Sequence, residues 1–312
     1  MRPLGRILSA LLAVVLLGCV EAPYTRSELR AMRRYESLPP DAREQSVEVR
    51  GKRIRFLEMG DGPPIVLLHS FPTSSYEWRH VIPLLARRYR VCAPDFVGYG
   101  KSTAEPSTDR SLAAQAPLIA EWMDHIGIES AIIVGQDIGG GVAQILAVKY
   151  PRRVKGLVLV NSVCFESWPS DYAELLAEPG WGRFTSNFFG ARPGLKGYLK
   201  RGVYQQALLS RGVVDNYAAP WQGAEGKRNL IRAAEALDPR DVRRVEGALR
   251  KIRVPTLVIA GRFDPIQSPN YSRRLAGAIP RSQFLSIPEC GHFASEDEPE
   301  KLVRYIFDYF KN

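Results

Sequence analysis

This chain of 312 residues contains only four cysteines. Their number and spacing argue against two kinds of domain, those held together by structural zinc and those held together by disulfides. Cys92, Cys164 and Cys290 are too widely spaced to match the common zinc-ligand patterns, so no metal site is expected. Three is an odd number, which argues against a disulfide framework. We therefore expect these three residues to be buried free thiols.

The sequence also lacks a long N-terminal apolar run and a concentrated basic stripe. The apolar run Ile7–Leu17 spans eleven residues, whereas a helix needs about 20 to cross a bilayer. The net charge is +10, but Lys and Arg are interspersed with acids, as in residues 228–253. Nucleic-acid binding requires a concentrated basic surface. No transmembrane helix and no nucleic-acid partner are therefore expected.

The N-terminus has the features of an export signal. Arg2 and Arg6 precede the short apolar run, as in a signal peptide. The run ends in "LLGC", which resembles the lipobox of bacterial lipoproteins, and that resemblance implies lipidation of Cys19. We expect residues 1–18 to be the signal peptide, residues 19–45 to be a tether, and the protein to be anchored to a membrane of the bacterial cell envelope. The alternative is an ordinary cleaved signal with a chance cysteine.

The sequence is rich in hydrophobic residues, which make up 45% of the chain and suffice for one large core. From residue 46 onward, strand-like and helix-like segments alternate, which indicates an α/β fold with a mostly parallel sheet flanked by helices. An initial hairpin turns at Gly51 and Lys52. Eight segments are strand-like, namely residues 46–50, 53–59, 64–69, 88–94, 131–135, 156–161, 255–261 and 282–288.

The alternation stops between residues 164 and 248, where tryptophan and proline punctuate helical segments and no convincing strand occurs. We interpret this stretch as a helical cap inserted between two parts of one core, residues 46–163 and 249–312. In open α/β sheets, ligands bind at the carboxyl edge of the strands. A cap inserted at this point would cover that edge.

The segment "GQDIGG" joins the strand-like run at 131–134 to a helical stretch and predicts a sharp strand-to-helix turn. Gly135, Gly139 and Gly140 would let backbone pass where a Cβ atom would clash. Asp137 stands at the tip, where such a turn exposes a nucleophile, and the Ile138 N–H at the helix start favours negative charge. The alternative is that Asp137 is only a helix N-cap.

Two later residues favour the catalytic interpretation. Asp264 directly follows one strand-like segment, and His292 follows the next. Nucleophile, acid and histidine therefore occur in the order that catalytic triads of this kind of sheet use. Earlier, the loop "HSFP" begins at a strand end, where Phe71 would supply a second oxyanion N–H. We expect His69 in this loop to orient it rather than to do chemistry.

From about residue 46 to the C-terminus the chain resembles the α/β-hydrolases that use an aspartate nucleophile, a group that includes epoxide hydrolases and haloalkane dehalogenases. The segment "PDFVGYGKS" matches the Asp-x-x-Gly-x-Gly-x-Ser motif of that superfamily. "HSFP" matches its His-Gly-x-Pro loop, except that Ser70 replaces the usual glycine. The resemblance implies a small hydrophobic substrate and water as reactants and no cofactor.

A carboxylate nucleophile suits displacement at an sp³ carbon, where it forms an alkyl ester on the enzyme. Asp137 would make this ester. Water activated by His292, which Asp264 orients, would then attack the Asp137 carbonyl carbon. The N–H groups of Phe71 and Ile138 would hold the resulting oxyanion.

The leaving group is less clear from the sequence. Haloalkane dehalogenases, as a family, bind the halide with a tryptophan after the nucleophile, often together with an asparagine in the loop or another tryptophan in the cap. Ile138 and Phe71 occupy the first two of these places. Trp168, Trp181 or Trp221 could compensate from the cap, and the alternative is that these tryptophans only form its core.

Epoxide hydrolases instead protonate the opening oxygen with cap tyrosines. The segment "DYAELLAEPG" resembles the first such stretch of that family and implies Tyr172 as one donor. The second place holds Ile231, so Tyr217 or Tyr204 would have to serve. Epoxide hydrolysis is therefore our first prediction and haloalkane dehalogenation the alternative. An ester or lactone hydrolase and a non-catalytic surface lipoprotein remain further alternatives.

Overall fold

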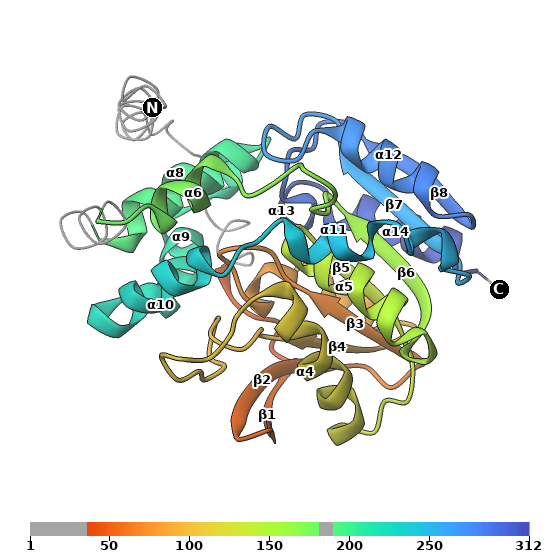
Figure 1. Ribbon diagram of the computed structural model, residues 1–312, viewed down its shortest axis with the longest axis horizontal. Coiled ribbons are helices and arrows are strands. Elements are labelled where there is room, and N and C mark those ends of the chain that lie inside the picture. The colour runs from red at the N-terminus through yellow and green to blue at the C-terminus, as the bar shows by residue number, and fades with distance from the viewer. Residues whose placement is uncertain (1–35, 181–189, 312) are drawn as a thin grey trace.

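A computed structural model describes residues 36–180 and 190–311. Eight strands form one sheet in the order β1-β2-β4-β3-β5-β6-β7-β8, with helices on both sides (Figure 1). β2 runs antiparallel to both of its neighbours, and all other pairs are parallel. The predicted fold class is confirmed. The strands are β1 (Arg43–Val49), β2 (Lys52–Met59), β3 (Pro64–Leu68), β4 (Arg90–Pro94), β5 (Ala131–Gln136), β6 (Val154–Val160), β7 (Thr256–Gly261) and β8 (Ser282–Ile287).

The central strands are buried on both faces, which explains their nearly continuous apolar sequences. In β3, Ile65 and Leu67 point into one core cluster and Val66 and Leu68 into the other, as the period of two in a strand requires. One face is covered by α4 (Leu112–His125), α5 (Ile138–Lys149) and α12 (Pro269–Ala278), and the other by α3 (Ile82–Leu85) and α14 (Pro299–Tyr309).

The cap follows β6 and lies to one side of the sheet in Figure 1. It is built from α6 (Asp171–Ala177), α8 (Ala191–Gly202), α9 (Arg211–Ala218) and α10 (Gly223–Glu235), with α6 packed on α10 and α8 on α9. The stretch between α10 and the predicted cap boundary at residue 248 contacts the core. α11 (Arg240–Glu246) packs on α4 and α5 of the core, and the Ala113 N–H donates to Asp241 at 3.2 Å.

The start of the core also differs from the prediction, because β1 begins at Arg43, inside the segment expected to be a tether. Gln45 pairs with Phe56 in the β1–β2 ladder, and this pairing orders residues that have no strand pattern of their own. Glu36 is held as well: its backbone carbonyl accepts hydrogen bonds from Tyr76 at 2.7 Å and from Asn216 of the cap at 2.8 Å. The chain is thus attached to core and cap before the first strand.

A buried ion pair of the core binds a tyrosine of the cap. Arg79 donates two hydrogen bonds to Glu296, which lies in the short helix α13 (Ala294–Asp297), and both side chains are almost fully buried. Tyr217 of α9 donates its hydroxyl to the same carboxylate. A second contact lies nearby, where Trp221 donates to the Pro72 carbonyl at 2.9 Å.

Three cysteines, Cys92, Cys164 and Cys290, are buried and free, as predicted. In the part of the chain that the structure describes, no helix combines the length and the apolar character that crossing a membrane requires. The predicted signal peptide, Cys19 and Trp181 lie outside the described residues.

Candidate active site

Asp137 stands alone between β5, which ends at Gln136, and α5, which begins at Ile138. Its φ and ψ of 52° and −119° lie in a region that non-glycine residues rarely adopt, and such strain is found mostly at functional sites. A Cβ atom on Gly135 would lie 2.3 Å from the Gly139 carbonyl oxygen, so the turn requires glycine there. The Asp137 side chain makes no N-cap hydrogen bond. The N-cap interpretation therefore does not explain this residue.

Two backbone N–H groups support the Asp137 carboxylate. Phe71 N–H donates to its Oδ2 atom at 3.0 Å, and Ile138 N–H contributes a second hydrogen bond. Burial raises the pKa of Asp137 above its usual value, while the neighbouring His292 and these two N–H groups act in the opposite direction. The structure thus brings both predicted oxyanion donors to the Asp137 carboxylate, and the Phe71 N–H contacts Oδ2.

His292 and Asp264 complete the constellation. His292 Nδ1 lies 2.9 Å from Asp264 Oδ2, and His292 Nε2 lies 3.8 Å from Asp137 Oδ1. A carboxylate only accepts, so Nδ1 carries a proton, and Nε2 faces Asp137. The other oxygen of Asp264 accepts N–H bonds from Ile266 at 2.7 Å and Gln267 at 2.8 Å. Among the described residues, Nε2 has no hydrogen-bond partner and is free to contact a reactant.

The electrostatic surroundings favour a charged histidine in the resting site. Burial alone would lower the pKa of His292, but the charge of Asp264 and its hydrogen bond, together with Asp137, outweigh burial and raise this pKa to about 9. His69 shows the opposite behaviour, because burial lowers its pKa to about 4. Its ring nitrogens contact the Ser70 carbonyl at 2.9 Å and the Phe96 N–H at 3.0 Å. His69 therefore orients the loop, as expected from the sequence.

A small cavity opens beside Asp137, and both the core and the cap line it. Its free volume is about 10 Å³, room for about one water molecule. Polar and apolar groups share its wall about equally. Its lining residues are Phe71, Asp137, Ile138, Val163, Trp168, Pro169, Ser170, Tyr198, Leu237 and Gln267.

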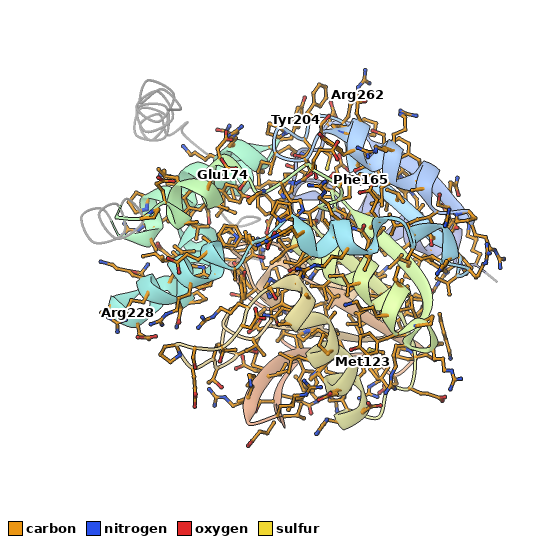
Figure 2. The ribbon with its side chains drawn as sticks, viewed as in Figure 1. Met123, Phe165, Glu174, Tyr204, Arg228 and Arg262 are labelled. Carbon is orange, nitrogen blue, oxygen red and sulfur yellow. The ribbon has the colours of Figure 1, made fainter. Side chains whose placement is uncertain are left out.

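The cap residues predicted to contact the leaving group lie at different distances from the cavity. Trp168 lines the cavity, and its buried Nε1 has no partner among the described residues. Tyr172 stacks on Tyr198 with ring centroids 5.0 Å apart. Tyr217 does not reach the cavity wall, because Glu296 binds its hydroxyl. Tyr204 lies at the outer edge near Arg262 (Figure 2), 45% exposed and stacked on Phe263.

Sequence reasoning missed Tyr198 and Gln267. Tyr198 of α8 lines the cavity, hydrogen-bonds with Ser170, and has a pKa raised well above the usual value by burial and by the nearby Asp137 charge. Gln267 lies three residues after Asp264 and has a buried Oε1 without a partner in the described chain. No sequence motif includes Tyr198. Its position beside the site depends on how α8 packs, which the local sequence does not determine.

A family model described as alpha/beta hydrolase fold matches residues 63–299. The chain belongs to the α/β-hydrolase fold family. It is 31% identical over 273 residues to haloalkane dehalogenase 2 of Mycobacterium tuberculosis, which covers 83% of this chain and 91% of the relative. It is 30% identical over 300 residues to bifunctional epoxide hydrolase 2 of Sus scrofa, which covers 84% of this chain and 54% of the relative.

Solved structures agree with these relatives. Haloalkane dehalogenase DbeA from Bradyrhizobium elkani matches with a TM-score of 0.76 and 25% identity, over 86% of this chain and 97% of that one. The homologues of this α/β-hydrolase are thus both haloalkane dehalogenases and epoxide hydrolases, and the prediction of a hydrolase is confirmed.

The raised pKa of His292 predicts a pH dependence of stability that needs no substrate. A histidine whose pKa rises from 6.5 to about 9 on folding stabilises the protein fully below pH 6.5 and loses this effect as the pH rises through 9. The difference in unfolding free energy between wild type and His292→Gln should therefore shrink by on the order of 2–3 kcal/mol between pH 6 and pH 10.

Urea unfolding at several pH values measures this difference. His125→Gln, which changes an exposed histidine on α4, is the control and should show a nearly constant difference. Parallel curves for wild type and His292→Gln would contradict the proposed electrostatic coupling of His292 to Asp264 and Asp137.

Proposed function

We propose that this protein hydrolyses small hydrophobic epoxides through an ester formed on Asp137. The covalent mechanism is supported by one observation, namely that the two Asp137 oxygens have different neighbours. Oδ2 receives the Phe71 N–H, while Oδ1 is 3.8 Å from His292 Nε2. One oxygen is therefore supported as the future carbonyl, and the other is available for attack.

In the first half-reaction, Asp137 Oδ1 attacks an epoxide carbon and the carbon–oxygen bond of the ring breaks. The opening oxygen takes a proton from a tyrosine hydroxyl, which becomes a tyrosinate. Tyr198 is suited to this role, because it lines the cavity and its raised pKa keeps the hydroxyl protonated until a strong base forms beside it. Tyr172, stacked on it, is the second candidate donor.

In the second half-reaction, His292 first gives its resting proton to the tyrosinate; the neutral imidazole then takes a proton from water, and the hydroxide attacks the Asp137 carbonyl carbon. The Asp137 charge is one cause of the high pKa of His292. Esterification removes that charge, so the pKa of His292 falls when the histidine has to act as a base. The tetrahedral oxyanion forms on Oδ2 between Phe71 and Ile138. On collapse, the leaving diol oxygen takes the proton of His292, and the regenerated Asp137 carboxyl gives its proton to His292, which restores the resting carboxylate and imidazolium.

Haloalkane dehalogenation is the second candidate, and Trp168 supports it. Its unpartnered Nε1–H lies in the wall of the cavity and could hold a departing halide. Ile138 follows the nucleophile and offers no side-chain donor. A halide would thus have fewer donors here than an alkoxide, which can also take the proton of Tyr198. The intact Asp137, Asp264 and His292 arrangement argues against a non-catalytic scaffold.

Trapping the ester tests the covalent mechanism. His292→Gln should be alkylated by an epoxide substrate but should not hydrolyse the ester, because only the second half-reaction needs the base. Mass spectrometry of the Asp137 peptide should show the added mass of the substrate. Asp137→Asn is the control and should start without an adduct. Product formation in His292→Gln at the wild-type rate, with no adduct, would disprove this mechanism.

Two cap variants distinguish the leaving groups. Tyr198→Phe should slow epoxide opening by about 10²-fold or more, the usual contribution of a general acid. Trp168→Phe should leave epoxide opening within about threefold of wild type, since a nitrogen donor is not used there. Both rates are measured by single-turnover alkylation. Strong bromide release from short haloalkanes that Trp168→Phe abolishes, without epoxide turnover, would reverse the ranking.

We also propose that Cys19 is lipidated and anchors the protein to a membrane of the bacterial envelope. The support is the "LLGC" sequence after a short apolar run. Expressed with its N-terminus in a bacterial host, the protein should sediment with membranes, and Cys19→Ala should release it. A wild-type protein that is found in the soluble fraction, with its mature N-terminus at another residue, would contradict the proposal.

A further inference from the structure

Ser70 stands where the aspartate-nucleophile relatives usually have glycine, and the structure shows what its side chain contacts. The residue is fully buried. Its backbone N–H donates to Glu77 Oε2 at 2.9 Å, and its hydroxyl donates to Glu77 Oε1 at 2.8 Å. Ser70 therefore binds both oxygens of one carboxylate, which a glycine could not do.

Glu77 itself is an unusual residue to find behind an active site. It lies in the short 3-10 helix η1 (Ser75–Trp78) and is fully buried. A third donor, the Thr73 hydroxyl, lies 2.5 Å from its Oε2 atom, so all three of these hydrogen bonds come from neutral groups. Burial of a carboxylate without a cation bonded to it costs several kcal/mol and calls for an explanation.

The same serine also contacts the nucleophile turn. Gln136 donates from Nε2 to the Ser70 hydroxyl oxygen at 3.1 Å, and Gln136 is the residue before Asp137. A continuous chain of hydrogen bonds thus runs from Glu77 through Ser70 to Gln136. Phe71 follows Ser70 directly, and Ile138 follows Gln136 by two residues. These hydrogen bonds therefore connect the two backbone segments that supply the oxyanion donors.

We propose that Glu77 is a positioning residue for the oxyanion hole: through Ser70, its carboxylate fixes the Phe71 N–H against Asp137 Oδ2. Glu77 does not touch the reacting atoms. Its catalytic effect, as distinct from its effect on the Phe71 N–H, rests on the covalent mechanism proposed above.

The two half-reactions should respond differently to this positioning. Attack by Asp137 Oδ1 removes negative charge from the carboxylate, so the Phe71 N–H contributes little to that step. Attack of water creates negative charge on Oδ2, and a displaced donor then weakens the transition state. Loss of the Glu77 contact should therefore slow ester hydrolysis far more than alkylation. A merely structural carboxylate would not change this ratio.

Two variants test the chain from different ends. Glu77→Gln keeps the size of the side chain but leaves one oxygen in place of two, and Ser70→Ala removes the hydroxyl while Glu77 stays. Each should slow hydrolysis of the Asp137 ester about tenfold or more, since loss of an oxyanion donor costs 10²–10³ and displacement costs less. Alkylation should change less than about threefold. Unlike wild type, both variants should then accumulate ester on Asp137 with His292 intact.

Amide hydrogen exchange of Phe71 gives a second measurement that needs no substrate. If Glu77 fixes this N–H, both variants should exchange it about tenfold faster than wild type. The matched control is Glu58→Gln. Glu58 is another buried glutamate; it lies on β2 and accepts a hydrogen bond from Arg90 at 2.6 Å. This control should change neither Phe71 exchange nor the ratio of the half-reactions.

The experiments distinguish failure of the Glu77 proposal from failure of the covalent mechanism. Unchanged Phe71 exchange in Ser70→Ala and Glu77→Gln would overturn the proposal, as would equal slowing of both half-reactions. If Glu77→Gln does not fold, Ser70→Ala decides by the same two measurements. Absence of an ester in His292→Gln would disprove the covalent mechanism alone, and the exchange result would still decide whether Glu77 positions Phe71.

Discussion

The buried charge of Asp137 is the constraint on which the rest of the site depends. Its side chain is only 6% exposed, and a carboxylate removed from water is stable only when hydrogen bonds and opposite charge replace the solvent. Phe71 and Ile138 provide the hydrogen bonds, and His292 provides the charge. The loop after β3, the start of α5 and the histidine after β8 together stabilise this buried charge.

The sequence predicts that Asp137, Asp264 and His292 lie together, because the sheet determines where these residues meet. Asp137, Asp264 and His292 each come shortly after a strand, namely β5, β7 and β8. Parallel strands end at one edge, so residues at these positions converge whatever the helices between them contain. The same reasoning places Phe71, which follows β3. In each case a local pattern fixes the strand end, and the strand end fixes the position of the side chain.

The cap cannot be predicted in the same way, because no sheet orients its helices. Tyr217 and Tyr198 both lie on amphipathic cap helices, yet Tyr217 is bound by Glu296 while Tyr198 lines the cavity. The rotation of a helix about its axis depends on partners that are distant in sequence. The same limit explains α11, whose sequence resembles the cap helices but whose apolar face packs on α4 and α5. It also explains β1, which begins at Arg43 because β2 pairs with it.

Glu77 places a third acidic group around His292, beside Asp137 and Asp264, and all three raise the pKa of the histidine. Burial raises the pKa of Glu77 itself to about 7, so this carboxyl is mostly ionised at pH 8. The three acids differ in what the reaction does to them. In the proposed reaction, esterification neutralises Asp137, while Asp264 and Glu77 do not react. The pKa of His292 then falls, and the two unreacted acids stabilise the imidazolium that forms when His292 takes a proton from water. In this mechanism the acid that reacts controls when His292 becomes a base, and the acids that do not react stabilise the cation that it then forms.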